Sequence, residues 1–265
     1  MRIALGIEYD GSHYCGWQAQ KHTPNTVQAV LEPALSFVAN HPVKLICAGR
    51  TDTGVHATQQ VAHFETDSLR DNKAWVMGAT TKLPRDVCIR WAKVVPTEFH
   101  ARFSAQTRSY RYLIYNSPVR QALLSTQMTW SYRPLDLDRM KVAGAHLVGE
   151  HDFSSYQAVA CQAKSAVRHV HHLKLSKVGD IIILDIKANA FLQHMVRNVV
   201  GVLMSIGCGD HPVDWAKEVL NQRDRTKGGV TAPPFGLYFV GVEYPEEFSI
   251  PEASLKIPVM PFFQE

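Results

Sequence analysis

The sequence has little of what would assign a function class by itself. Its five cysteines are widely spaced and form no C-x-x-C pair; they are Cys15, Cys47, Cys88, Cys161 and Cys208. This spacing argues against a zinc ribbon or a disulfide framework and suits a reducing compartment. Neither G-x-G-x-x-G nor G-x-x-x-x-G-K-[ST] occurs, so we expect no nucleotide cofactor.

Long apolar runs are also missing. No stretch of about 18 apolar residues occurs, as a membrane-spanning helix would need. The N-terminal segment MRIALGIEYDGS reaches an acidic residue at position 8, which does not fit a secretory signal. We therefore expect a soluble cytoplasmic protein without a membrane partner. The net charge of +4 is a mild basic excess, compatible with a polyanionic partner but not proof of one.

Hydrophobic periodicity predicts an α+β fold made of two related units. In the first unit, residues 2–9 alternate between apolar and other positions, which predicts a half-buried strand. Asn25 is expected to cap a helix, with Gln28 as its capping-box partner. Further strands at 59–65 and 87–95 and a helix at 71–83 complete a largely antiparallel sheet with helices on one side.

The second unit repeats a similar order. Residues 108–115 alternate strongly, Asp136 or Asp138 opens a helix, and 166–177 and 180–189 form a hairpin around a turn at 178–179. A helix is expected at 191–206, ended by Gly207. We place the boundary at residue 104, giving an N-terminal unit of residues 1–104 and a C-terminal unit of residues 105–265.

The segment GRTDTG, residues 49–54, follows an apolar run at 43–48 and is bracketed by two glycines. It places the guanidinium of Arg50 and the carboxylate of Asp52 at the mouth of a strand, held by a stiff element yet open to a ligand. A polar turn bonded to its own backbone explains the same composition. The motif alone does not decide between these readings.

Two further segments carry candidate chemistry. The strand RSYRYLIY, residues 108–115, alternates arginine and tyrosine, as RNA-binding sheets do, although its rings could equally face a core. The run MVRNVVGVLM, residues 195–204, is apolar except for Arg197 and Asn198. An arginine in such surroundings calls for an anionic partner, for which Asp52 is a candidate, unless Arg197 lies at the surface.

Histidine clustering does not predict a metal site. His169 and His171 would point to one side of a strand and His172 to the other. No cysteine or carboxylate nearby completes a coordination set, so we expect no metal.

The chain resembles the TruA-type tRNA pseudouridine synthases over essentially its full length. The matching stretches are YDGSHYCGWQ, NTVQAVLEPAL, AGRTDTGVHA, FHARFSAQTRSYRYLIYN, HDFSSY, SAVRHV, FLQHMVRNVVGVLMSIG and APPFGLYF. The resemblance implies the pseudouridine synthase fold, two related units with largely antiparallel sheets forming a central sheet flanked by helices. It also implies an isomerase of uridines at positions 38, 39 and 40 of the tRNA anticodon arm, a homodimer without cofactor or metal.

The resemblance also implies a role for five residues. Asp52 would be the catalytic residue and Arg197 its paired guanidinium. Tyr110 would stack on the target base, Leu237 would form an apolar wall of the pocket, and Arg50 would help turn the nucleotide out of the stem.

Two rival functions remain at this stage. A non-catalytic RNA-binding module would bind tRNA whether or not Asp52 is present. A glycosidic-bond hydrolase would need a second carboxylate, for which Asp10 and Asp152 are the nearest candidates.

Overall fold

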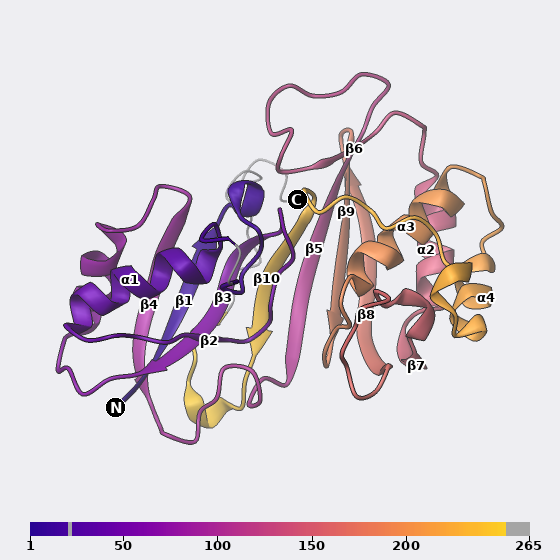
Figure 1. The fold of residues 1–265 in the computed structure, drawn as a ribbon. Coiled ribbons are helices and arrows are strands. Elements are labelled where there is room, and N and C mark those ends of the chain that lie inside the picture. The colour runs from indigo at the N-terminus through magenta and orange to yellow at the C-terminus, as the bar shows by residue number, and fades with distance from the viewer. Residues whose placement is uncertain (21–22, 253–265) are drawn as a thin grey trace. The chain divides into compact units, whose positions relative to one another are not determined.

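The computed structural model describes residues 1–20 and 23–252. They form two compact units, whose elements are labelled in Figure 1. The first unit comprises Met1–Gln106 together with the described residues from Tyr238 on, and the second comprises Thr107–Leu237. The boundary at residue 104 stays a prediction about domains.

The first unit is built on a largely antiparallel sheet. Its elements are β1 (Arg2–Tyr9), α1 (Val27–Ala39), β2 (Ile46–Cys47), β3 (His56–Glu65), a π-helical turn (Ala74–Gly78), β4 (Val87–Val95) and β10 (Leu237–Glu243). β1 lies between β3 and β4 and is antiparallel to both, and β2 is antiparallel to β3. β10 is parallel to β3, so the last strand of the described residues belongs to the first unit. Helix α1 crosses one face of the sheet (Figure 1).

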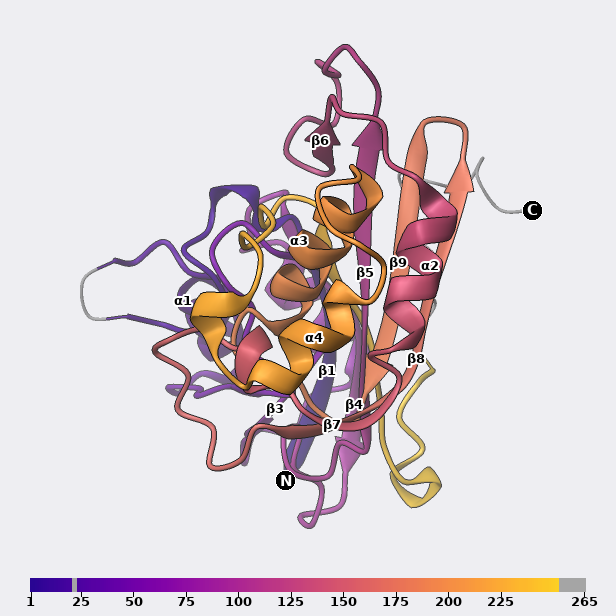
Figure 2. The same cartoon turned by 90° about the vertical axis from the view of Figure 1, so that its right-hand side faces the viewer.

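The second unit has the same class of architecture. Its elements are β5 (Thr107–Asn116), β6 (Thr129–Ser131), α2 (Leu137–Ala145), β7 (Gly149–Asp152), β8 (Val167–Val178), β9 (Ile181–Ala188), α3 (Met195–Gly207) and α4 (Trp215–Gln222). β5, β9, β8 and β7 are antiparallel neighbours in that order, and β6 pairs with β5 in parallel. The three helices gather on one side of the strands (Figure 2). These sheets and helices confirm the expected α+β class.

The first strand is more buried than its alternation predicted. Residues 3–7 are all buried, whereas a half-buried strand would expose alternate residues such as Ala4 and Gly6. Trp91 of β4 covers this face, since a Cβ on Gly6 would lie 2.1 Å from the indole nitrogen. The absence of a side chain at Gly6 therefore lets a neighbouring indole close the second face of β1.

Helix α1 begins one residue later than predicted, because Thr26 and not Asn25 is its N-cap. The Thr26 hydroxyl accepts from the amide of Ala29 at 3.3 Å. The predicted capping box is therefore wrong, and the side chain of Gln28 is used elsewhere.

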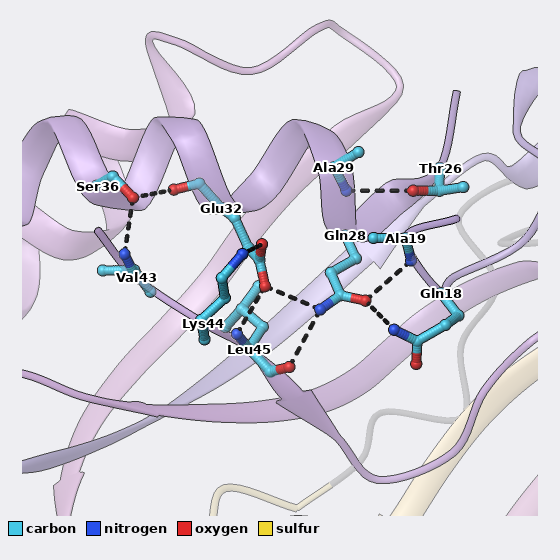
Figure 3. A network of polar contacts seen from close by, with 10 residues as sticks. All are labelled: Gln18, Ala19, Thr26, Gln28, Ala29, Glu32, Ser36, Val43, Lys44 and Leu45. Atoms are coloured by element: carbon cyan, nitrogen blue, oxygen red, sulfur yellow. Dashed lines mark hydrogen bonds and ion pairs between the residues drawn. The ribbon is translucent and has the colours of Figure 1, made fainter. Parts of the chain in front are cut away.

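Gln28 joins α1 to two loops (Figure 3). Its carbonyl oxygen accepts from Gln18 Nε2 at 2.7 Å and from the amide of Ala19 at 3.0 Å, while its Nε2 donates to Glu32 Oε1 at 2.8 Å and to the Leu45 carbonyl at 3.3 Å. Glu32 in turn accepts from the amide of Leu45 at 3.0 Å. This network fixes the chain that enters β2 and then the segment GRTDTG.

Helix α3 also begins later than predicted. His194 is its N-cap and has a φ of 61°, a left-handed conformation that interrupts the expected helix from residue 191. Phe191 therefore lies outside the helix. Its ring meets Tyr110 of β5 edge-on, with ring centroids 5.0 Å apart.

Candidate active site

The segment GRTDTG connects β2 to β3 in the first unit and carries Arg50 and Asp52. Arg50 is exposed, Asp52 is half-buried, and Thr51 between them is buried. The Asp52 carbonyl accepts from the amide of Val55 at 3.2 Å, which closes a turn. The loop thus presents a carboxylate and a guanidinium while it buries the residue between them.

The chain from Tyr9 to Trp17 holds this loop from behind. The amide of Trp17 donates to the Thr51 carbonyl at 3.0 Å, and the amide of Gly54 donates to the Tyr14 carbonyl at 3.2 Å. The hydroxyls of Tyr9 and Thr51 are 2.8 Å apart, and burial raises the pKa of Tyr9 well above its usual range. A neutral phenol is therefore locked onto the residue before Asp52.

Gly11 and His56 hold the far end of the same loop. A Cβ on Gly11 would lie 1.9 Å from the Val55 carbonyl oxygen, so only glycine fits this approach. The Gly11 amide donates to His56 Nδ1 at 3.1 Å, and the buried His56 ring stacks on Tyr238 of β10 at 4.7 Å. The backbone on both sides of Asp52 is consequently fixed within one unit.

The thiol of Cys47 reports the charge around the loop. Burial raises the pKa of this thiol to about 12, and the positive charges of Arg50 and Arg102 oppose the rise. Both guanidiniums therefore lie close enough to act on the end of β2. Two guanidiniums on this side of the first unit could meet a polyanion.

In the second unit, Arg197 is held by the segment that leads to Leu237. Arg197 Nε donates to the Ala232 carbonyl at 2.8 Å, and the amide of Ala232 donates back to the Arg197 carbonyl at 3.1 Å. Gly201, one turn later in α3, permits this contact, because a Cβ there would lie 1.8 Å from the Val230 carbonyl oxygen. The guanidinium is thus oriented by backbone and is not a freely moving surface arginine.

A buried polar network supports the same segment. Asn198 Oδ1 accepts from Thr231 Oγ1 at 2.6 Å and from an Arg225 guanidinium nitrogen at 3.1 Å, and Asn198 Nδ2 donates to the Tyr156 carbonyl at 2.7 Å. Asn198 is 2% exposed, so its side-chain amide is buried together with its bond to the Tyr156 carbonyl. The side-chain amide of Asn198 therefore holds the loop at Thr231, and the Ala232 carbonyl of the same loop orients Arg197.

Tyr110 and Leu237 are the remaining predicted site residues of the second unit. Tyr110 is half-buried on β5, with its ring against Phe191. Two residues later, the buried Tyr112 donates to the Pro233 carbonyl at 2.7 Å. Leu237 is buried, and its amide donates to the Pro234 carbonyl at 2.9 Å. The 231–237 segment thus contacts both α3 and β5, the elements that carry Arg197 and Tyr110.

The predicted site residues therefore fall into two groups. Arg50 and Asp52 lie on one loop of the first unit, whereas the second unit carries Tyr110 on β5, Arg197 on α3 and Leu237 at the end of the 231–237 segment. The pairing of Asp52 with Arg197 stays a prediction.

The sequence reasoning missed the residues that hold these groups in place. Among them are Tyr9, Gly16, Asn198 and Thr231. A signal was present for Asn198, which follows Arg197 as a second polar residue in an otherwise apolar helix.

Among the described residues, no group of three or more histidine, cysteine and acidic side chains could hold a metal ion. None of the described helices is both long and apolar enough to cross a membrane.

Comparison with known proteins assigns the family. The family model described as tRNA pseudouridine synthase matches residues 6–104 and 143–245. The tRNA pseudouridine synthase A of Pseudomonas aeruginosa is 59% identical over 254 residues, which cover 96% of this chain and 89% of that protein. The enzymes of the same name from Alcanivorax borkumensis and Nitrosococcus oceani are 56% and 57% identical, covering 96% and 98% of this chain and 95% and 100% of those proteins. The chain therefore belongs to the tRNA pseudouridine synthase family, which confirms the resemblance seen in its motifs.

Proposed function

We propose that this enzyme isomerises uridine to pseudouridine at positions 38, 39 and 40 of the tRNA anticodon arm, with Asp52 as its catalytic residue. The observation that carries the proposal is the loop around Asp52. Its backbone is fixed from both sides by buried contacts, whereas Asp52 itself is only half-buried. A carboxylate held in this way is preorganised for chemistry on a ligand.

The reaction needs little besides such a carboxylate. The bond from ribose C1′ to N1 of uracil breaks, the uracil turns, and C5 bonds to C1′. C5 gives up a proton and N1 gains one, so atoms and electrons balance without a redox carrier or an external acceptor. Asp52 can attack C1′, add to the uracil ring, or abstract the 2′ proton, and all three routes begin from its ionised form.

The remaining residues act around this carboxylate. Arg197 pairs with Asp52 and orients its carboxylate by a charge-assisted hydrogen bond. Tyr110 stacks on the target base, and Leu237 forms an apolar wall that excludes water from the reactive intermediate. Arg50 helps turn the nucleotide out of the stem, a step that costs a few kcal/mol. These roles rest on the resemblance and are supported by the fixed geometry around Arg197.

A hydrolase would need a second carboxylate as acid or base, and neither candidate, Asp10 or Asp152, is in a suitable environment. Asp152 accepts from the hydroxyl and the amide of Ser154, at 2.6 and 2.9 Å, and these bonds lower the pKa of its carboxyl. A glycosidase acid needs a raised pKa to carry a proton at neutral pH. Asp10 likewise accepts from Ser12 at 2.5 and 2.9 Å, as a turn-forming carboxylate does.

The test is tritium release from uracil C5 in labelled tRNA, measured with excess chelator and followed by mapping of the product. We expect release from wild-type enzyme and pseudouridine at positions 38 to 40. Tight tRNA binding without any release would instead support the non-catalytic RNA-binding module. Free uracil that still carries its C5 tritium, together with an abasic site, would support the hydrolase.

We further propose that the enzyme works in the cytoplasm as a homodimer, as the resemblance implies. Sedimentation equilibrium should give twice the chain mass of 29.7 kDa. A single-chain mass at micromolar concentration in the presence of tRNA would contradict the dimer.

A further inference from the structure

The most exposed aromatic side chain among the described residues lies outside the proposed catalytic group. Phe103 is 77% exposed, whereas the next most exposed aromatic residues, Phe37 and Tyr132, are 66% and 63% exposed. Phe103 follows β4 in the turn FHARFS, residues 99–104, of the first unit. A single exposed apolar residue is common at protein surfaces, so exposure alone explains nothing.

The surroundings of Phe103 are what distinguish it. The His100 ring stacks on the Phe103 ring, with centroids 4.3 Å apart and planes inclined by 28°. The Arg102 guanidinium carbon lies 5.7 Å from the centroid of the same ring, within the range of a cation–π contact. An exposed ring is thus combined with an imidazole and a guanidinium, the groups on which nucleobases stack.

Hydrogen bonds hold the backbone of the turn that carries these groups. His100 Nδ1 accepts from the amides of Arg102 and Phe103 at 3.2 Å each, and the His100 amide donates to Ser104 Oγ at 2.9 Å. The Ala101 amide donates to His63 Nδ1 of β3 at 3.1 Å. These bonds hold the backbone of the turn, and the His100 ring packs on Phe103, which reduces the entropy lost when a ligand stacks there.

Two guanidiniums lie near the turn, those of Arg102 and of Arg2, and Arg2 is paired with Glu65. Burial lowers the pKa of His100, and the guanidiniums of Arg2 and Arg102 lower it further. Burial raises the pKa of the Cys47 thiol, and the charges of Arg50 and Arg102 both lower it. Arg102 of the turn and Arg50 of the GRTDTG loop therefore both lie near the end of β2 in the first unit. A nucleobase on Phe103 would bring its phosphate near the guanidinium of Arg102.

We propose that Phe103, backed by His100 and flanked by Arg102, is a stacking platform for an unpaired nucleobase of the substrate RNA. The platform deepens the proposed function, because it takes RNA to be the substrate. It anchors RNA during binding and takes no part in bond breaking. Replacing the ring therefore changes affinity and leaves the rate at saturation unaltered.

The first test measures tRNA dissociation constants for Phe103→Ala, Phe103→Leu and Phe103→Trp. Loss of a base–aromatic stack should weaken binding by about 10-fold or more in the alanine and leucine variants. The tryptophan variant should bind within about twofold of wild type, because it keeps an aromatic face. Phe37→Ala is the matched control, since Phe37 is similarly exposed in the same unit and has Lys82 Nζ 4.3 Å from its ring centroid. It should bind like wild type.

Other outcomes overturn the platform. If Phe103→Ala binds tRNA like wild type, no base stacks there. If Phe103→Ala binds tRNA weakly and sedimentation shows that its oligomeric state has changed, the ring belongs to a contact with a second copy of the chain. If leucine restores binding, the contact is apolar and not stacking.

The experiments distinguish a failure of the Phe103 platform from a failure of the proposed synthase function. Normal binding by Phe103→Ala, with release from wild type, removes the platform and keeps the synthase. Weak binding by Phe103→Ala, with no release from wild type, keeps an RNA platform and removes the synthase.

Discussion

Gly16 shows how closely the residue that precedes Asp52 is held. Its φ is +85°, and a Cβ there would lie 2.5 Å from the Thr51 carbonyl oxygen and 3.1 Å from the Asp52 carbonyl carbon. Glycine is required twice, once for the left-handed backbone and once for the close approach. The position of the carboxylate thus depends on a residue 36 positions earlier in the chain.

Replacing Gly16 by alanine should therefore damage both stability and activity. Gly209 is the matched control, because its φ is +83° and no atom lies within 4 Å of its Cβ position. Gly209→Ala should cost about 1 kcal/mol, the strain of the left-handed backbone alone. Gly16→Ala should lower the melting temperature further and reduce kcat, since the clash displaces the loop. Equal melting temperatures and equal kcat values for the two variants would show that the clash has no effect.

His63 gives the stability a defined pH dependence. It is 2% exposed, and burial lowers the pKa of its imidazole to about 4. Between about pH 6.5 and 4 the unfolded chain binds a proton that the folded chain does not, so the free energy of unfolding falls as the pH falls through this window. Above pH 6.5 both states are neutral at this site and the contribution is constant.

The comparison variant is His63→Gln, which keeps an acceptor for the Ala101 amide. Between pH 7 and 4.5 its melting temperature should fall less than that of the wild type. Other groups add to the slope in both proteins, so the difference between them isolates His63. Parallel melting curves at all pH values would rule out this role.

Among the secondary structure elements, helix α3 carries both Arg197 and the buried residue that holds the loop next to it, Asn198. The Asn198 side chain hydrogen-bonds to Thr231, Arg225 and the Tyr156 carbonyl. The loop that contains Thr231 also supplies the Ala232 carbonyl that accepts from Arg197. Removing the amide takes the Asn198 donor from the buried bond to the Tyr156 carbonyl, at a cost of about 1 to 3 kcal/mol. The loop should then relax and release the guanidinium of Arg197.

We expect Asn198→Ala to lower the melting temperature and to reduce kcat while the KM for tRNA changes little. Asn198→Asp keeps the acceptor for Thr231 and Arg225, so it should recover part of kcat. Asn221→Ala, at an exposed position of α4, should match wild type. A loss of stability in Asn198→Ala without any change in kcat would show that the network is structural only.

The elements with strong local patterns could be predicted from the sequence. β4 lies at the predicted residues, and the hairpin of β8 and β9 turns where Val178 and Gly179 indicated. Asp136 caps α2, one of the two residues considered for that position. Alternation, a turn glycine and a capping aspartate act over a few residues, so one sequence contains them.

What could not be predicted depends on distant residues. Gln28 has the sequence position of a capping partner, but its side chain bonds to Gln18 and Leu45 instead. The left-handed backbone at His194 shortens α3 at its start, and α4 had no prediction. For the site, the motif around Asp52 was visible, whereas its clamp through Gly16 and Trp17 arises only when the chain folds.

The whole molecule meets its substrate with a net charge of only +4, so local positive groups must carry the contact with phosphate. Binding of tRNA should weaken as salt rises, with a linear dependence of log Kd on log salt concentration. Arg102→Ala should reduce the magnitude of the slope by about 0.7 to 0.9, the value for one phosphate contact. Phe103→Ala should weaken binding without changing the slope, because stacking releases no counterion. A reduced slope for Phe103→Ala would indicate that the variant also displaces Arg102.

The most direct test of the central claim is the single-turnover rate of tritium release from uracil C5 by Asp52→Asn at saturating enzyme. Asparagine keeps the size of the side chain and removes the nucleophile and base. The account predicts a rate lower than wild type by at least about 10⁴-fold, the scale for loss of an essential nucleophile, with the Kd for tRNA within about threefold. Release within about tenfold of wild type would contradict Asp52 as the catalytic residue, whatever its effect on binding.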